Sequence, residues 1–137
     1  MKKLFSIAAL IVVAKFCFAQ KLQKGNLLGL HVMTVTLKPG VTMDQFTTFY
    51  VTKLIPVYEK QFDGAKGFLV KGRRGGSQDK LGVLWFFETE QARDKYFNKD
   101  GLTEIGKAAA AKTEDVQKEL EKLGTYTDEA YTDWIVQ

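Results

Sequence analysis

The chain has 137 residues, among them 20 lysines and arginines, 16 aspartates and glutamates, one histidine and one cysteine. This length is typical of a single domain, and a composition of 45% hydrophobic and 26% charged residues excludes an intrinsically disordered chain. The net charge of +4 would suit a protein that binds polyanions, but most of the excess lies near the N-terminus.

The N-terminal segment has the layout of a secretory signal peptide. Met1–Lys3 is basic, Leu4–Val13 is almost wholly apolar, and Cys17–Ala19 is a small-x-small cleavage site. The segment is too short to span a membrane and is interrupted by Lys15. Lys15 and Phe16 also depart from the pattern that directs lipidation of a cysteine. We therefore predict cleavage after Ala19, which would leave one periplasmic or secreted domain, residues 20–137, with no membrane association.

Several site chemistries are excluded for the processed chain. Cleavage removes three lysines and no acid, which leaves 17 basic against 16 acidic residues, so no nucleic-acid partner is expected. Loss of Cys17 excludes disulfides, thiol catalysis and cysteine-ligated metals. One histidine excludes a multi-histidine metal site within a subunit, and Ser77 lies in a glycine-rich turn unlike a nucleophile elbow. We expect neither a metal nor a cofactor.

The first half of the predicted domain contains one strand and one helical segment. Leu27–Leu37, rich in valine, threonine and leucine, is predicted as a strand that ends at Lys38–Gly40. Thr42 and Gln45 have the spacing of a capping box and predict the start of a helix. Apolar residues continue at helical spacing to about Phe62. Pro56 lies within this pattern, so we expect a kink or a break followed by a second short helix.

The second half predicts two strands, two helices and a last strand, listed here in chain order: strand Ala65–Arg73, a hairpin loop over 74–80, strand Leu81–Glu88, a helix capped by Thr89 that includes Tyr96 and Phe97, one helix over Leu102–Leu123, and strand Tyr131–Val136. Without the additional helix, this order is the split βαβ pattern of ferredoxin-like folds. The predicted class is therefore α+β, a four-stranded antiparallel sheet with its helices on one face.

The predicted strands are apolar on both faces. In the first strand, Leu28, Leu30 and Val32 face one way, whereas Leu27, Met33 and Val35 face the other. In the third strand, Val83, Trp85 and Phe87 oppose Leu84 and Phe86. Helices cover only one face of such a sheet, and each buried leucine or phenylalanine contributes about 1.5–3 kcal/mol. We therefore predict a homodimer in which two sheets stack face to face.

The chain resembles the dimeric α/β-barrel superfamily, which contains antibiotic-biosynthesis-monooxygenase-like and stress-responsive barrel domains. The resemblance is carried by strand Gly29–Val35, turn Lys38–Gly40, helix Met43–Tyr58, the Gly64–Phe68 entry to the second strand, and the Phe87–Ala92 junction. It covers nearly all of the predicted domain and implies the dimeric barrel. Members include cofactor-independent oxygenases, haem degraders and isomerases, and many have no known activity.

His31 is the candidate catalytic residue, because it is the only imidazole and lies mid-strand on the face of Met33 and Val35. It would act as a general base in a cavity between sheet and helices. The alternative is a structural histidine that bonds a backbone carbonyl or is buried between two subunits. A partner carboxylate is not identifiable from the sequence.

Aromatic side chains are the candidate ligand-binding residues: Trp85, Phe87, Tyr50, Tyr58 and Tyr96. They would line an apolar pocket, although aromatic residues at strand and helix spacing also form ordinary core. In the haem-degrading branch of the superfamily, the axial histidine aligns near Gly106, which has no imidazole, so haem binding or breakdown is a minor possibility.

Two functions remain open for the cavity. The first is a cofactor-independent, monooxygenase-like enzyme acting on a small aromatic or quinone-like compound. The second is a non-catalytic ligand-binding or stress-related module. The sequence leaves open whether the chain is an enzyme, and whether Arg73 and Arg74 contact a ligand.

Overall fold

A computed structural model describes residues 21–137. The predicted signal peptide, residues 1–19, lies outside the described residues. In the described part of the chain, no helix combines the length and hydrophobicity needed to cross a bilayer.

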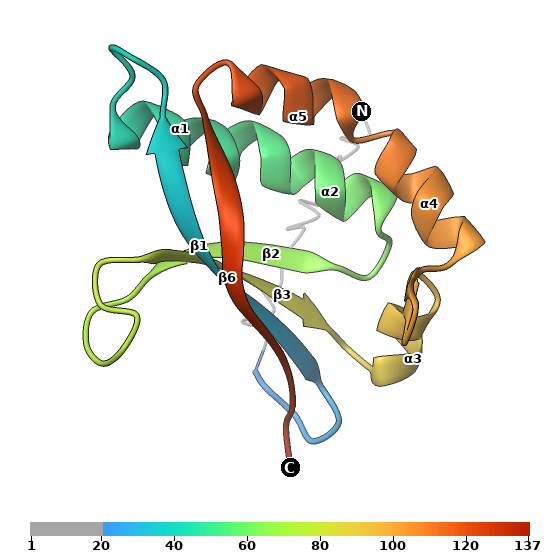
Figure 1. Ribbon diagram of the computed structural model, residues 1–137. Coiled ribbons are helices and arrows are strands. Elements are labelled where there is room, and N and C mark those ends of the chain that lie inside the picture. The colour runs from blue at the N-terminus through green and yellow to red at the C-terminus, as the bar shows by residue number, and fades with distance from the viewer. Residues whose placement is uncertain (1–20) are drawn as a thin grey trace, which may run out of the picture.

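The sheet contains four antiparallel strands in the spatial order β2-β3-β1-β6 (Figure 1). The strands are β1 (Leu27–Leu37), β2 (Lys66–Lys71), β3 (Leu81–Phe87) and β6 (Gly124–Ile135). The first strand, β1, lies at the centre of the sheet and pairs with the last strand, β6, at its edge. This is the ferredoxin-like arrangement. All main helices lie over one face of the sheet in Figure 1. The α+β, ferredoxin-like prediction is confirmed by this topology.

The first helical segment changes geometry before Pro56. It consists of α1 (Met43–Phe49), a π-helical turn η1 (Tyr50–Leu54) and α2 (Ile55–Gln61). Thr42 and Gln45 form the predicted capping box. Pro56 has no N–H for the regular ladder, and the preceding Ile55 N–H reaches five residues back to the Tyr50 carbonyl. The predicted irregularity is therefore a widened turn rather than a break.

The segment after β3 differs from its prediction. Thr89 caps α3 (Glu90–Asp94) as expected, but Tyr96 and Phe97 lie beyond its end. The predicted inclusion of these two residues in the helix is wrong. The chain instead forms a small hairpin, β4 (Phe97–Asn98) paired with β5 (Gly101–Leu102), whose turn uses a positive φ at Gly101.

The predicted single helix over 102–123 is also wrong. The segment forms two helices instead: α4 (Glu104–Ala111), which Thr103 caps, and α5 (Glu114–Glu121). Thr113 lies between them, and both its N–H and its hydroxyl donate to the Ala110 carbonyl. That competition ends α4, and the acids Glu114 and Asp115 open the next helix, where the helix dipole favours them.

The last strand is twice as long as expected, because β6 begins at Gly124 rather than at Tyr131. Its first half is polar, which is tolerated at the edge of a sheet. The register with β1 shifts between Val32 and Met33, where β6 contains a bulge. This bulge places Asp128 opposite Met33, and Glu129 on the opposite face, where it bonds Thr34 and Lys80.

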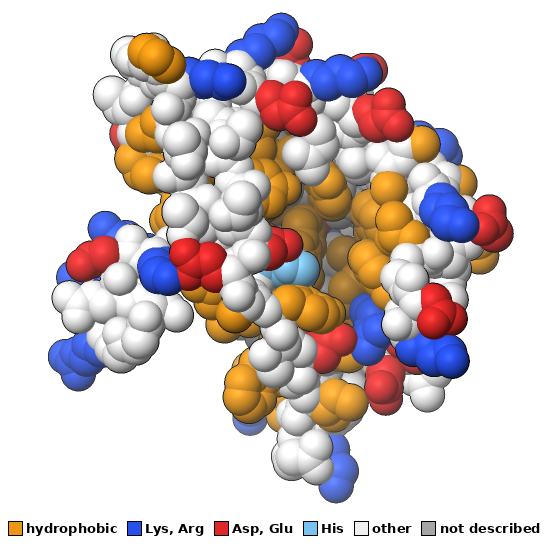
Figure 2. Space-filling model, in the orientation of Figure 1, with side chains coloured by type: hydrophobic (Ala, Val, Ile, Leu, Met, Phe, Trp, Pro, Cys, Tyr) orange, Lys and Arg blue, Asp and Glu red, His pale blue; other side chains and the backbone are white. Residues whose placement is uncertain are grey.

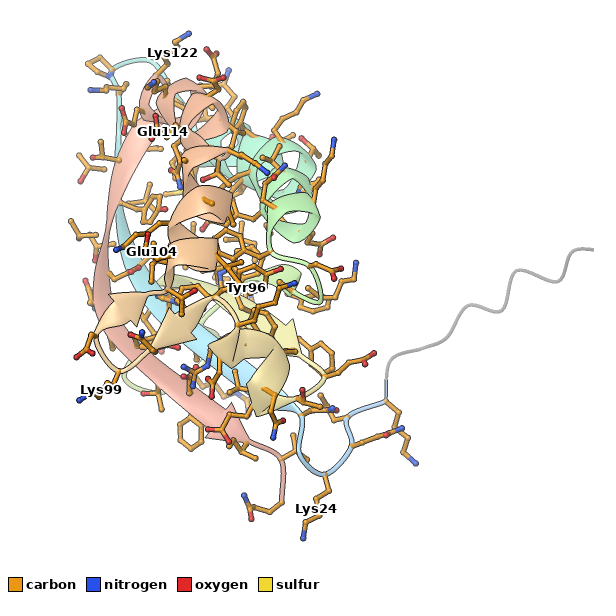
Figure 3. The ribbon with its side chains drawn as sticks, turned by 90° about the vertical axis from the view of Figure 1, so that its right-hand side faces the viewer. Lys24, Tyr96, Lys99, Glu104, Glu114 and Lys122 are labelled. Carbon is orange, nitrogen blue, oxygen red and sulfur yellow. The ribbon has the colours of Figure 1, made fainter. Side chains whose placement is uncertain are left out.

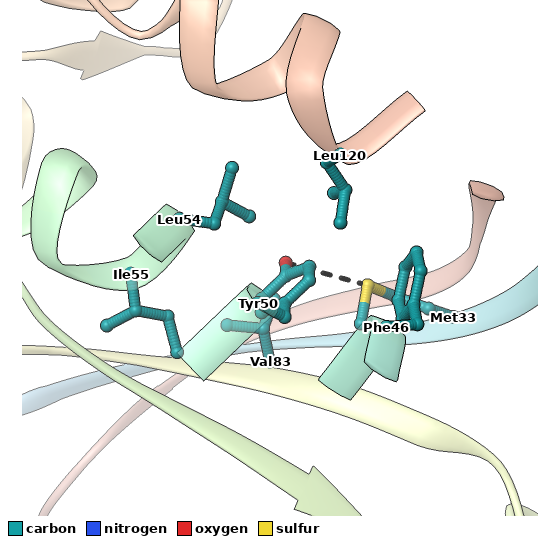
Figure 4. Close-up of a cluster of buried hydrophobic side chains, with 7 residues drawn as sticks. All are labelled: Met33, Phe46, Tyr50, Leu54, Ile55, Val83 and Leu120. Atoms are coloured by element: carbon teal, nitrogen blue, oxygen red, sulfur yellow. Dashed lines mark hydrogen bonds between the residues drawn. The ribbon is translucent and has the colours of Figure 1, made fainter. Parts of the chain in front are cut away.

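The main core lies between the sheet and the helices (Figure 4). It joins side chains from β1, β3, α1, η1, α2 and α5: Met33, Phe46, Tyr50, Leu54, Ile55, Val83 and Leu120. A second cluster under α4 contains Leu27, Phe62, Ala65, Phe87, Tyr96 and Ala109. The cavity described below lies beside these two clusters.

Candidate functional site

A cavity of about 580 Å³ opens between the inner face of the sheet and the helices. Figure 2 shows it as a hollow walled largely by hydrophobic side chains, with the histidine on its wall. This volume lies in the range of small-molecule sites. The lining comes from β1, β3, β6, η1, α2, α3 and the β4–β5 hairpin.

Aromatic rings form much of the wall. The rings of Tyr58 and Trp85 have centroids 5.7 Å apart, and Tyr58 also stacks on Phe62 at 5.7 Å. Trp85 packs against Gly67, where a Cβ would come within 2.6 Å of the indole. A planar, apolar ligand therefore matches the shape and chemistry of this wall.

His31 and Asp128 form a pair at the cavity wall. His31 Nδ1 lies 3.2 Å from Asp128 Oδ2, with the side chains 29% and 49% exposed. With its proton on Nδ1, the ring donates to the carboxylate and keeps a lone pair on Nε2. Among the described residues, Nε2 has no hydrogen-bond partner. The arrangement is that of a base oriented by a carboxylate.

The β6 bulge is what brings Asp128 to this position. On the C-terminal side of the bulge, the odd-numbered Tyr131 and Asp133 face the cavity, whereas on its N-terminal side the even-numbered Tyr126 and Asp128 do. Since side chains alternate along a strand, an unbulged strand would direct Glu129 inward instead. One inserted residue therefore supplies the carboxylate of the pair.

A chain of contacts links His31 to α3. The ring of Tyr131 lies 4.3 Å from the His31 ring, and its hydroxyl donates to Asp133. Asp133 in turn accepts from Arg93 at 3.0 Å. Burial, and then Asp133, raise the pKa of the Tyr131 phenol, so it stays a donor. Gly29 leaves room for these side chains, because a Cβ there would lie 3.0 Å from Asp133 Oδ1.

Five of the six predicted site residues line the cavity: His31, Tyr50, Tyr58, Trp85 and Phe87. Tyr96 does not. It is buried against Phe62, with ring centroids 5.1 Å apart, and belongs to the core. Its predicted ligand contact rested on a helix that ends two residues earlier. Figure 3 shows Tyr96 inside the molecule and Lys99 at its edge, on the β4–β5 hairpin.

Sequence reasoning missed Asp128, Tyr126 and Arg93. The first two belong to the half of β6 that was not predicted, although Thr125, Tyr126 and Thr127 are residue types that favour strands. Arg93 lies on α3, far in sequence from the rest of the wall, and joins it through its ion pair with Asp133. Arg73 and Arg74 lie in the β2–β3 loop and are not among the lining residues.

The backbone around Gly106 bears on haem binding. A Cβ on Gly106 would lie 2.1 Å from the Tyr96 carbonyl oxygen, so this position of α4 accepts no side chain. The axial histidine of the haem-degrading branch therefore has no place on this backbone. Within residues 21–137, no group of three histidine, cysteine, aspartate or glutamate side chains is arranged to hold a metal.

Comparisons with known proteins yield likenesses of structure only. No protein-family model matches the chain, and no curated protein matches it. One similar structure is a dimeric protein of unknown function and ferredoxin-like fold from Bacteroides fragilis, with 11% identity, 82% of this chain and 98% of that chain covered, and a TM-score of 0.45. Another is an uncharacterized NIPSNAP-like domain protein from Burkholderia xenovorans, with 12% identity and a TM-score of 0.45. The match covers 84% of this chain and 86% of that chain.

Proposed function

We propose that this chain is a periplasmic or secreted, homodimeric domain of the dimeric α/β-barrel type that binds a small aromatic or quinone-like compound and removes a proton from it without a cofactor. The observation that carries the proposal is the His31–Asp128 pair, which opens onto an aromatic-walled cavity of about 580 Å³. The signal-peptide pattern of residues 1–19 supports the extracytoplasmic location.

The proposed chemistry begins with proton transfer to Nε2 of His31. The substrate C–H or O–H bond breaks, its electron pair stays on the substrate, and Asp128 stabilises the imidazolium that results. In a monooxygenase-like reaction, the electron-rich anion then reacts with dioxygen. A CH₂ group becomes a carbonyl, with one oxygen atom retained and the other released as water with the two hydrogens.

A two-ring ketone with acidic C–H bonds, 2-tetralone, tests this function directly. We expect the purified protein to bind it and to accelerate exchange of its C1 protons in D₂O, measured by proton NMR. A general base contributes about 10²–10⁴-fold. Binding is followed by the fluorescence of Trp85 in a Trp134→Phe background, which leaves it as the sole tryptophan. Failure to bind any of a panel of aromatic ketones, naphthols and quinones would refute the function.

A non-catalytic binding or stress-related role is the second candidate. It is favoured by the aromatic wall itself, because stacked rings such as Tyr58 and Trp85 bind a planar compound without any reaction. Binding of 2-tetralone without accelerated exchange, and without turnover of a quinol under air, would select this role over catalysis.

The homodimer is proposed from the outer face of the sheet. Phe68 is 49% and Trp134 59% exposed on that face, and Val70 is exposed beside Phe68. Partly exposed Leu30 and Leu84 lie between them. Apolar side chains gathered on one sheet face are typical of an interface.

We expect Phe68→Lys to convert the dimer to a monomer, because it places a charge within the apolar face. The mass from light scattering should fall by half. Val51→Lys is the matched control, since Val51 is 48% exposed but lies on η1, away from the sheet. A wild-type protein with the mass of one chain would contradict the proposed dimer.

A further inference from the structure

Three tyrosines meet at one part of the cavity wall: Tyr50 from η1, Tyr58 from α2 and Tyr126 from β6, here called the phenol cluster. The rings of Tyr50 and Tyr126 meet edge to face, with centroids 6.1 Å apart. Tyr50 belongs to the π-helical turn, a local widening that often occurs at functional sites. Only Tyr50 and Tyr58 were predicted from the sequence, as apolar ring contacts rather than as hydrogen-bond donors.

Gln117 of α5 directs the hydrogens of two of these phenols. Its Nε2 amide donates to the hydroxyl oxygen of Tyr58. It also bonds Tyr126, where it lowers the pKa of the phenol and so acts as a donor there too. A phenol that accepts on its oxygen keeps its own O–H for another partner. Neither phenol donates to another side chain in the described residues, so both hydrogens remain for a ligand.

Tyr50 uses its own hydrogen within the phenol cluster. Its side chain is almost fully buried, and its hydroxyl lies 3.8 Å from the thioether of Met33 (Figure 4). It also hydrogen-bonds the Tyr126 phenol; this bond raises the pKa of Tyr50 and lowers that of Tyr126, as expected when Tyr50 donates. Because Tyr126 accepts this bond on its oxygen, its own O–H still remains for a ligand. Burial raises the pKa of Tyr50 and of Tyr126 above the usual phenol range, so both remain protonated donors at neutral pH.

The phenol cluster lies close to the proposed base. The Asp128 carboxylate, which bonds His31, is near enough to contribute to the raised pKa of both Tyr50 and Tyr126. Its hydrogen bond, however, goes to the imidazole. One region of the cavity therefore combines a proton acceptor with two O–H donors, Tyr58 and Tyr126, that donate to no other side chain in the described residues.

We infer that the phenol cluster is an oxyanion subsite that holds the carbonyl oxygen of an aromatic ketone or quinone-like ligand whose acidic proton His31 removes. The inference rests on the proposed function and specifies its substrate class. The C–H bond next to the carbonyl breaks, the proton goes to His31 Nε2, and the electron pair moves onto the carbonyl oxygen to give an enolate. Preorganised donors stabilise the charge where it develops.

The test compares 2-tetralone with tetralin, which has the same two rings and no carbonyl. Wild-type protein should bind 2-tetralone more tightly than tetralin. Tyr58→Phe or Tyr126→Phe should lower the affinity for 2-tetralone about threefold to tenfold, as expected for the loss of one hydrogen bond. The affinity for tetralin should not change. Proton exchange of 2-tetralone should slow on the order of 10²-fold, as for other oxyanion donors. Tyr96→Phe is the matched control, because this buried phenol does not line the cavity.

Two results would overturn the inference. If the Tyr→Phe variants weaken the binding of tetralin and of 2-tetralone equally, or weaken the binding of neither compound, the phenols only pack against the ligand. The proposed function would survive that result, provided that exchange still depends on His31. If the wild-type protein neither binds nor exchanges 2-tetralone or any related ketone, the inference and the proposed function both fail.

Discussion

Replacing Leu120 with alanine is expected to lower the free energy of unfolding by about 2–5 kcal/mol, the range for leucine in a closed core. Leu120 is 1% exposed and connects α5 to the cluster around Phe46 and Leu54. The change removes apolar contacts and leaves a cavity, because the β1 and α1 side chains around it are fixed by their own packing. Urea titration followed by circular dichroism measures the loss.

Leu22→Ala is the control of identical chemistry. Leu22 is 52% exposed and precedes β1, so its loss should change the free energy of unfolding by less than about 0.5 kcal/mol. Equal effects at Leu22 and Leu120 would mean that α5 does not pack on the sheet as described.

Replacing His31 with glutamine is expected to slow proton exchange of 2-tetralone by about 10²–10⁴-fold, the range for loss of a general base. Glutamine is similar in size and still donates to Asp128, but its amide takes up no proton at neutral pH. The affinity for 2-tetralone should change little, since the aromatic wall of Trp85 and Tyr58 is untouched. The exchange rate, the dissociation constant and the melting temperature are measured together.

The stability measurement separates catalysis from structure at His31. A variant that exchanges protons as fast as the wild-type protein would remove His31 from the mechanism. A lowered melting temperature with weaker binding would instead assign it the structural role of supporting the β1–β6 pair, which its contacts with Asp128 and Tyr131 also permit.

The elements with strong local signals were predictable. The run Leu27–Leu37 and the capping box of Thr42 and Gln45 both occur as expected. The two-faced character of β1 and β3 was also evident from alternation alone, since side chains alternate along any strand. His31 was placed on the cavity face for the same reason.

The elements that failed are those whose local preference is overridden by their neighbours. Thr125–Ala130 is polar and was not predicted as a strand, but β1 offers it an unpaired edge. Thr113 divides a segment of good helix formers because its hydroxyl reaches the Ala110 carbonyl. Tyr96 left its expected helix, and thus the predicted site, because α3 ends early and its ring packs on Phe62.

The sequence by itself determined the order of the four strands of the main sheet, their antiparallel pairing and the presence of a histidine on the inner face, because these follow from local periodicity. The tertiary structure alone decided the partners of that histidine. Asp128 and the phenols come together from β6, η1 and α2, and the β1–β6 bulge determines which β6 residues face inward. A one-residue shift in pairing reverses the facing of every following side chain, and that shift arises from contacts between distant segments.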